Sequence, residues 1–198
     1  MPIVIGAKQE SSFGDPVGLL TDCHRRIERF LGVLGRVCEL AGGGPLTIEQ
    51  RGALDTALRY FREAAPKHTA DEEKTLFPRL RTLDSPAAKA IVARVDELEA
   101  QHGVADESHA EIDRLGMAWL NAGNLTPEDA GRMASQIAAL REMYKGHIAA
   151  EEREVFPVAS AEFDQAARDA MGGEMAARRG QQWPAAPDSA AAIFAANR

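Results

Sequence analysis

Residues 68–78 read HTADEEKTLFP and residues 147–157 read HIAAEEREVFP, so the chain contains an internal repeat. Both copies begin with His-x-x-x-Glu, add a second Glu directly after it and end in Phe-Pro. A spacing of four residues puts the His and the first Glu on one face of a helix, one turn apart. Imidazole nitrogens and carboxylate oxygens together suit iron, zinc or manganese. The repeat therefore predicts two helices that each present a His–Glu pair to a metal.

A lone histidine precedes each copy of the repeat at almost the same distance. His24 lies 44 residues before His68, and His102 lies 45 residues before His147. The chain thus reads as two helical hairpins, each of which contributes one histidine and then one His-x-x-x-Glu pair. This arrangement predicts a pseudo-two-fold site that holds two metal ions.

Helix-start signals and short breaks indicate four long helices. A helical stripe of apolar residues follows Asp15-Pro16 and ends near Leu40, before a Gly-Gly-Gly-Pro break. The other three starts carry the same signals, a capping side chain followed by a proline or by a capping-box glutamine. These three helices are expected from Thr47 to about Leu80, from Ser85 to about Leu120, and from Thr126 to the Phe156-Pro157 region.

The short breaks imply an all-α fold, an antiparallel up-down-up-down four-helix bundle with a short C-terminal helix. This last helix is expected from about Asp164 to Arg179, with an interruption at Gly172-Gly173. No segment alternates with period two for long enough to indicate a sheet. We expect three parts along the chain: an irregular segment (1–15), the bundle (16–160), and the short helix with a flexible Ala- and Pro-rich tail (161–198).

The composition excludes several classes of function. The chain has 198 residues, of which 45% are hydrophobic and 27% charged, as in an ordinary soluble domain. Its net charge of -7 and the lack of a basic cluster disfavour nucleic-acid binding. No run approaches the roughly 18 consecutive apolar residues of a membrane span. The sequence therefore predicts neither a nucleic-acid nor a membrane partner, and it leaves the oligomeric state open.

The two cysteines, Cys23 and Cys38, do not predict a disulfide. They lie 15 residues apart in one expected helix, which separates them by roughly 22 Å at about 1.5 Å per residue. The first residues lack both the basic flank and the apolar run of a signal peptide. These features favour a reducing compartment, and we expect a cytoplasmic protein.

Height along the bundle selects the metal ligands among the histidines. In an antiparallel hairpin, residues equally far from the turn lie at similar heights. Counting from the three expected turns places the repeat histidines, His68 and His147, at about the same height along the bundle as His24 and His102. The first Glu of each repeat lies on the same helix face as its histidine. The expected metal ligands are therefore His24, His68, Glu72, His102, His147 and Glu151.

Other polar residues near this level are expected outside the ligand set. His109 lies two turns from the histidine level. Glu28 and Asp106 each follow a lone histidine by four residues, but their helices run opposite to those of the repeats. They therefore lie on the other side of that level from the repeat glutamates. Glu73 and Glu152 sit about 100° round the helix from their neighbours and are expected on the helix flanks.

Two buried carboxylates are costly without cations, and this cost points to two metals. Two divalent or trivalent ions bridged by Glu72 and Glu151 would remove it. A structural zinc ion usually takes four closed ligands. Two histidines per metal with shared carboxylates leave open positions, which suit a di-iron centre that meets a small molecule.

At these residues the sequence resembles the hemerythrin family, specifically the bacterial hemerythrin-like, or HHE cation-binding, domains. The resemblance covers about residues 16–160 and implies an antiparallel four-helix bundle around a non-haem di-iron site with an oxo or hydroxo bridge. It assigns the ligand roles to the six residues given above, with zinc and manganese as substitutes. Asp106 stands where oxygen-carrying hemerythrins have a further histidine, which opens a coordination position. The four-His, two-Glu set looks more like the di-iron proteins of iron–sulfur cluster repair and nitric-oxide response.

The expected partner is a small diatomic ligand, oxygen or nitric oxide, which the protein binds or senses, or else the protein handles iron under oxidative or nitrosative stress. One alternative is a redox enzyme that turns over peroxide or nitric oxide at the open site. The other is a non-catalytic interaction bundle in which a metal merely joins the helices. Tyr144 is expected in the core packing, with a hydrogen bond to a metal-bound ligand as its alternative role.

Overall fold

Four capped helix starts set the frame of the bundle in the computed structural model, which describes residues 11–183. At each start a side chain accepts a hydrogen bond from a backbone N–H three residues on, which satisfies one of the free donors of the first turn. The second start carries the complete capping box that the sequence indicates. The helices that follow are α1 (Pro16–Ala41), α2 (Ile48–Glu63), α5 (Pro86–Ala122) and α6 (Pro127–Ala150).

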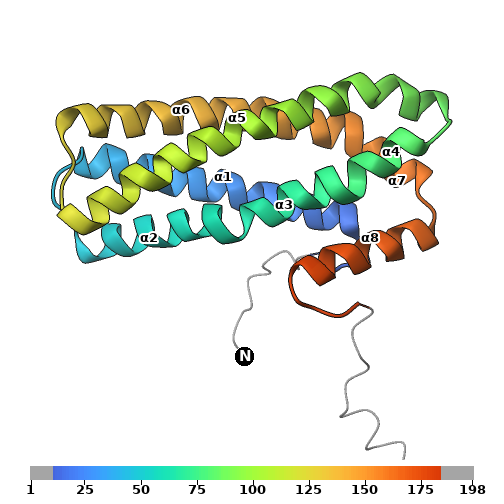
Figure 1. The fold of residues 1–198 in the computed structure, drawn as a ribbon, viewed down its shortest axis with the longest axis horizontal. Helices are drawn as coiled ribbons and strands as arrows, with labels where there is room; N and C mark the ends of the chain where they lie inside the picture. Colours follow the sequence, from blue (N-terminus) through green and yellow to red (C-terminus); the bar gives the residue numbers. More distant parts are fainter. Residues whose placement is uncertain (1–10, 184–198) are drawn as a thin grey trace, which may run out of the picture.

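These helices form one bundle with a further helix, α8 (Gln165–Arg178), packed against its side (Figure 1). Within the bundle, α1 contacts α2 and α6, and α5 contacts the same two helices. Figure 1 shows the connections between successive long helices at alternate ends of the bundle. The described residues contain no strand. The prediction of an all-α bundle with a short C-terminal helix is therefore confirmed.

The second expected helix is not one uninterrupted α-helix, and the prediction is wrong on this point. After α2 the chain continues as α3 (Ala65–Asp71), η1 (Glu72–Leu76) and α4 (Phe77–Thr82). Pro66 lies in the first turn of α3 and has no backbone N–H to offer the preceding turn, so α2 ends just before it.

The repeat ends in a π-helical segment in both copies, which the sequence analysis did not predict. The first is η1, and the second is η2 (Glu151–Val155), which connects α6 to α7 (Phe156–Glu162). In each segment the backbone N–H of the repeat's Phe bonds the carbonyl of its first Glu, five residues earlier. The proline after that Phe lacks an N–H donor, so the regular ladder is already broken at this point. The Phe-Pro ending thus marks the end of each π segment.

A layer of buried polar side chains divides the core in two. One apolar cluster, which includes Ile27 and Ala105, fills the half of the bundle nearer the α1–α2 and α5–α6 turns. The other includes Leu20 and Leu98 and fills the half against α8. Each of these apolar residues lies within one helical turn of His24 or His102. The sequence-predicted histidines therefore lie between the two clusters.

Helix α8 runs without a break, so the expected interruption at Gly172-Gly173 is wrong. Gly172 is buried because the backbone carbonyl of Phe13 approaches it closely. A Cβ atom there would lie 2.0 Å from that oxygen. The glycine therefore permits close packing rather than ending the helix. The flexible tail and most of the irregular N-terminal segment were expected in residues 184–198 and 1–10, which lie outside the described residues.

Two other expectations concern the membrane and the cysteines. In residues 11–183 no helix combines the length and the apolar character needed to cross a bilayer. Cys23 and Cys38 are both free thiols, as expected for two cysteines in one helix.

Candidate metal centre

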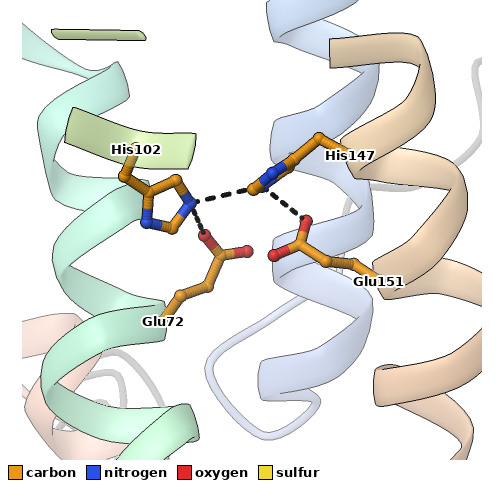
Figure 2. A group of neighbouring side chains, drawn as sticks. All are labelled: Glu72, His102, His147 and Glu151. Atoms are coloured by element: carbon orange, nitrogen blue, oxygen red, sulfur yellow. Dashed lines mark hydrogen bonds and ion pairs between the residues drawn. The ribbon is translucent and has the colours of Figure 1, made fainter. Parts of the chain in front are cut away.

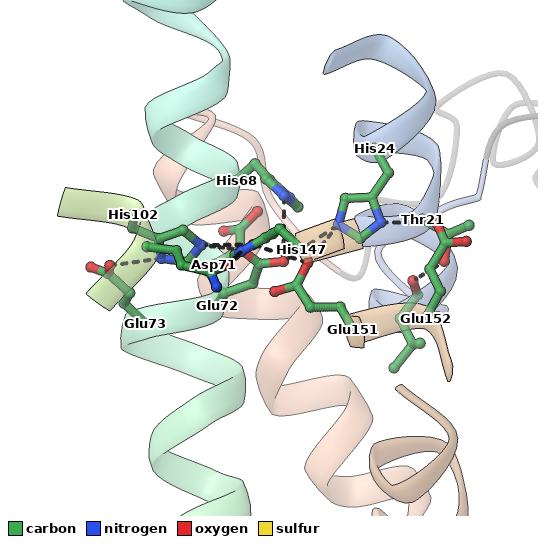
Figure 3. Close-up of polar contacts among 12 residues, drawn as sticks. Thr21, His24, His68, Asp71, Glu72, Glu73, His102, His147, Glu151 and Glu152 are labelled. Carbon is green, nitrogen blue, oxygen red and sulfur yellow. Dashed lines mark hydrogen bonds and ion pairs between the residues drawn. The ribbon is translucent and has the colours of Figure 1, made fainter. Parts of the chain in front are cut away.

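Six side chains meet in the polar layer, and they are the six that the sequence analysis selected (Figure 3). None is more than 4% exposed. The two lone histidines come from α1 and α5, the repeat histidines from α3 and α6, and the two glutamates from the first positions of η1 and η2. Residues far apart in sequence thus converge because four helical segments pass through one level. The six are His24, His68, Glu72, His102, His147 and Glu151.

Their ligand atoms fall into two groups that share one carboxylate. His24, His68 and Glu72 form the first group, and Glu72, His102, His147 and Glu151 form the second. In each group the atoms lie within 4.8 Å of one another. Figure 2 shows the second group, with both carboxylates facing the two imidazole rings. Such spacing allows one cation to contact all members of a group.

Each carboxylate also lies between one histidine of each hairpin. Glu72 approaches His68 Nε2 at 3.3 Å and His102 Nε2 at 3.5 Å. Glu151 approaches His24 Nε2 at 3.0 Å and His147 Nε2 at 3.3 Å. Both carboxylates are therefore within reach of histidines from the two hairpins.

Three of the four histidines are oriented through their other ring nitrogen. The Nδ1–H groups of His24 and His102 donate to carboxylate oxygens of Glu152 and Glu73, each at 2.9 Å. The Nδ1–H of His147 donates to the side-chain carbonyl of Gln101, also at 2.9 Å. These partners fix the tautomer, so that each Nε2 lone pair faces inward. Metal-binding histidines are typically held in this way.

Glu73 and Glu152 lie outside both ligand groups, as expected, but the sequence analysis did not predict that they contact the histidines. Both side chains are partly buried and each orients a histidine from a neighbouring helix. The second Glu in both copies of the repeat was the available signal, since a purely solvent-facing residue needs no such match. Gln101, directly before His102, carried no comparable signal in the sequence.

The polar layer holds more acceptors than donors, which is the test of whether it suits a cation. Within the described residues, His24 Nε2 and all four carboxylate oxygens of Glu72 and Glu151 have no hydrogen-bond partner. His102 Nε2 and His147 Nε2 face each other at 3.2 Å, although both rings place their proton on Nδ1. Buried unpaired acceptors cost free energy, and a positive ion removes that cost for all of them at once. The donor set therefore fits metal ions.

The ionisation of the layer leads to the same conclusion. Burial raises the pKa of Glu72 well above its usual value, and the neighbouring Glu151 raises it further. Burial acts in the same direction on Glu151, but the close approach of the His147 and His24 rings outweighs it and lowers the pKa of that carboxyl. Burial would lower the pKa of His24, but the same two carboxylates raise it to about 10. Without a cation, protons must therefore neutralise part of the layer.

Aromatic rings border the layer on both sides. Phe156 stacks on His24 with ring centroids 5.3 Å apart, and Phe77 lies parallel to His102 at 6.1 Å. On the opposite side, the Tyr144 ring meets the His147 ring edge-on at 6.0 Å. The Tyr144 hydroxyl is paired with His109 Nε2 at 3.1 Å. The rings therefore limit the access of water to the histidines.

The remaining candidate ligands, two acidic residues and one histidine, lie outside the layer. Glu28 and Asp106 are both exposed, and Glu28 pairs with Arg25 on its own helix. His109 stacks on Phe61 with ring centroids 4.4 Å apart. Neither ligand group includes any of these residues.

Replacing Glu73 or Glu152 by alanine is expected to weaken metal binding by about 10- to 100-fold, because the histidine each one orients loses its anchor. The affinity is measured by competition with a chelator, with helix content checked by circular dichroism. Glu154→Ala is the matched control, since Glu154 also lies in η2 but is exposed and pairs with Arg94. Unchanged affinity in both anchor variants would contradict the orienting role.

Comparison with known proteins places this geometry in a family. The model of the hemerythrin HHE cation binding domain matches residues 15–159. An uncharacterized protein of Haemophilus influenzae (strain ATCC 51907 / DSM 11121 / KW20 / Rd) is 29% identical over 99 residues. That match covers 50% of this chain and 55% of the relative, so the chain spans about half the length of this curated relative.

Proposed function

This chain belongs to the hemerythrin HHE cation-binding family, and from that membership we propose that it holds two iron ions and binds a small diatomic ligand at them. The family match and the buried His–Glu cluster identify a metal-binding helical bundle. The proposal adds the identity of the metal, the number of ions and the ligand. Each of these has its own support in the site.

The observation that carries the proposal is the position of the two carboxylates between the hairpins. Glu72 and Glu151 each approach one histidine of the first hairpin and one of the second. A single ion needs no such bridging pair, whereas two ions, each with two histidines, need both carboxylates. The ligand count per ion then falls below a closed shell, which favours a reactive centre over a structural zinc site.

The residues of this chain have distinct roles in such a centre. Bound iron would supply coordination positions for an external ligand and would be able to change its oxidation state. Glu73, Glu152 and Gln101 hold three imidazoles with the Nε2 lone pair inward. Phe77 and Phe156 cover the rings from the side of α8 and keep water from them. The bundle thus fixes the ligands and limits access.

A surface cleft near Tyr144 approaches the polar layer. A cleft of about 520 Å³ opens between α1 and α6, and Tyr144 forms part of its wall together with Leu31 and Ala138. Because Tyr144 also contacts the His147 ring, it touches both this cleft and the polar layer. A diatomic molecule is small enough to pass beside one aromatic ring when that ring moves. The cleft therefore supports binding of a small ligand.

The test is a titration of the anaerobic, iron-loaded, reduced protein with oxygen and, separately, with nitric oxide. The proposal predicts a saturable change in the absorption spectrum with at least one of the two. Steady-state consumption of the ligand or of peroxide would instead assign an enzyme. A protein that holds two irons but shows no spectral change with either gas would overturn the proposed ligand.

A further inference from the structure

Helix α8 lies beyond the part of the chain that the family model matches, yet it reaches the metal layer. It packs against α1, α3 and η1 (Figure 1). Its polar contacts with α3 and η1 centre on Asp71, the last residue of α3, a charged residue with no exposed surface. We call the residues that make these contacts, Asp71, Thr75, Glu174, Arg178 and Arg179, the α8 clamp.

The clamp consists of short charge-assisted hydrogen bonds. Arg178 donates to one carboxylate oxygen of Asp71 at 2.7 Å, and Arg179 donates to the other at 2.6 Å. Arg178 also donates to the Thr75 hydroxyl at 2.5 Å, and this hydroxyl donates to Glu174 at 2.7 Å. Both oxygens of the buried carboxylate are therefore satisfied from α8, which gives the contact a defined geometry.

The clamp brackets the metal-binding segment of the first hairpin. Asp71 directly precedes Glu72, and Thr75 lies three residues after it within η1. His68 lies one turn before Asp71 on α3, and its Nδ1 has no hydrogen-bond partner in the described residues. The corresponding His147 is held by Gln101. In the first copy of the repeat, the orientation of His68 thus depends on the position of the α3 backbone. In the second copy, a side chain orients His147.

Within residues 11–183 the second hairpin has no equivalent of the clamp. In the repeat, Ala150 occupies the place of Asp71 and Glu154 the place of Thr75. Glu154 is exposed and pairs with Arg94 of α5. The six metal-layer residues follow the pseudo-two-fold pattern of the repeat. The contacts that hold them in place do not, because the α8 clamp joins only the first copy of the repeat. This asymmetry gives α8 its main influence over the ligand group that contains His68.

We propose that Arg178 and Arg179 are positioning residues that set the affinity of the metal position formed by His24, His68 and Glu72 more strongly than that of the other position, with which it shares only Glu72. The proposal rests on the proposed two-metal function. The arginines touch neither ligand atoms nor metal. They act through Asp71 and Thr75, by holding α3 and η1 where His68 and Glu72 face His24.

The test compares metal release from three loaded proteins in excess chelator. In the Arg178→Met/Arg179→Met variant, one of the two metals per chain is expected to leave about tenfold faster than in the wild type, with a clearly smaller change in the second rate. Arg168→Met is the matched control on the same helix, because Arg168 donates to the carbonyls of Phe163 and Ser160 rather than to η1. Equal release of both metals from the double variant and the wild type would overturn the proposal.

A balanced variant guards against simple unfolding. Removing only the arginines leaves Asp71 buried without a partner, which itself destabilises the fold. Asp71→Ala/Arg178→Met/Arg179→Met copies the Ala150 side of the repeat, leaves no buried charge at that position and is expected to show the same selective release. Selective release restricted to the double variant, with wild-type release from the balanced variant, would contradict the positioning role.

Hydrogen exchange on the metal-free proteins separates this proposal from the proposed function. The balanced variant is expected to exchange faster than the wild type in residues 68–78 and at the wild-type rate in residues 147–157. This readout needs no iron, so a failure to load iron would contradict the proposed function alone. Unchanged exchange in residues 68–78 would overturn the role of α8.

Discussion

Glu72→Gln is expected to reduce the metal content of the chain from about two ions to fewer than one. Glu72 is the one residue common to both ligand groups, so its loss removes a ligand from each. An amide lacks the charge that balances a cation, and its nitrogen is not a ligand. The metal content after reconstitution with iron and desalting, measured by elemental analysis, gives the result directly.

The same substitution is expected to leave the metal-free protein about as stable as the wild type. Burial and the neighbouring Glu151 raise the pKa of Glu72, so the neutral carboxyl is the form that the metal-free layer favours. Glutamine has the same shape and no charge. Glu73→Gln is the control, because it keeps an acceptor for His102 and should retain two metals. Two tightly held irons in the Glu72→Gln variant would show that Glu72 is not a bridging ligand.

Removal of the metal from the wild-type protein is expected to lower its thermal midpoint by about 8–16 °C. Binding to the folded state alone adds about 4 kcal/mol at a free metal concentration of about 1,000 times Kd. For a chain of this size each kcal/mol corresponds to about 2–4 °C. This stabilisation by the metal originates in the polar layer, where buried carboxylate oxygens and imidazole nitrogens have no partner when no cation is bound.

Differential scanning calorimetry before and after chelation measures this shift. The Glu72→Gln variant is the internal control, since its midpoint should hardly respond to chelator. An unchanged wild-type midpoint, after elemental analysis has verified metal loss, would mean that the metal does not bind the buried layer.

The elements with strong local signals were predictable from the sequence. The helix starts at Asp15, Thr47, Ser85 and Thr126 each carry a capping side chain, and the structure places a capping hydrogen bond at all four. These signals are local, so they do not depend on what packs against the helix. The repeat likewise located the residues that meet in the polar layer, because four-residue spacing on a helix translates directly into a shared face.

Features that depend on packing between distant segments were not predictable. Gly172 looked like a helix interruption, but the close approach of the Phe13 carbonyl determines its role. The π segments directly precede Pro78 and Pro157, which lie in the first turns of α4 and α7. At these points a proline removes a backbone donor while packing against other segments holds the helix in place. The clamp on Asp71 joins residues over 100 positions apart, and no spacing rule relates them.

The most direct test of the two-iron centre is the iron content of anaerobically purified protein, together with its absorption spectrum before and after exposure to air. The account predicts about two irons per chain and, after exposure, near-ultraviolet charge-transfer bands of a bridged ferric pair. Zinc alone, or an intact helical fold that takes up no iron on reconstitution, would contradict it.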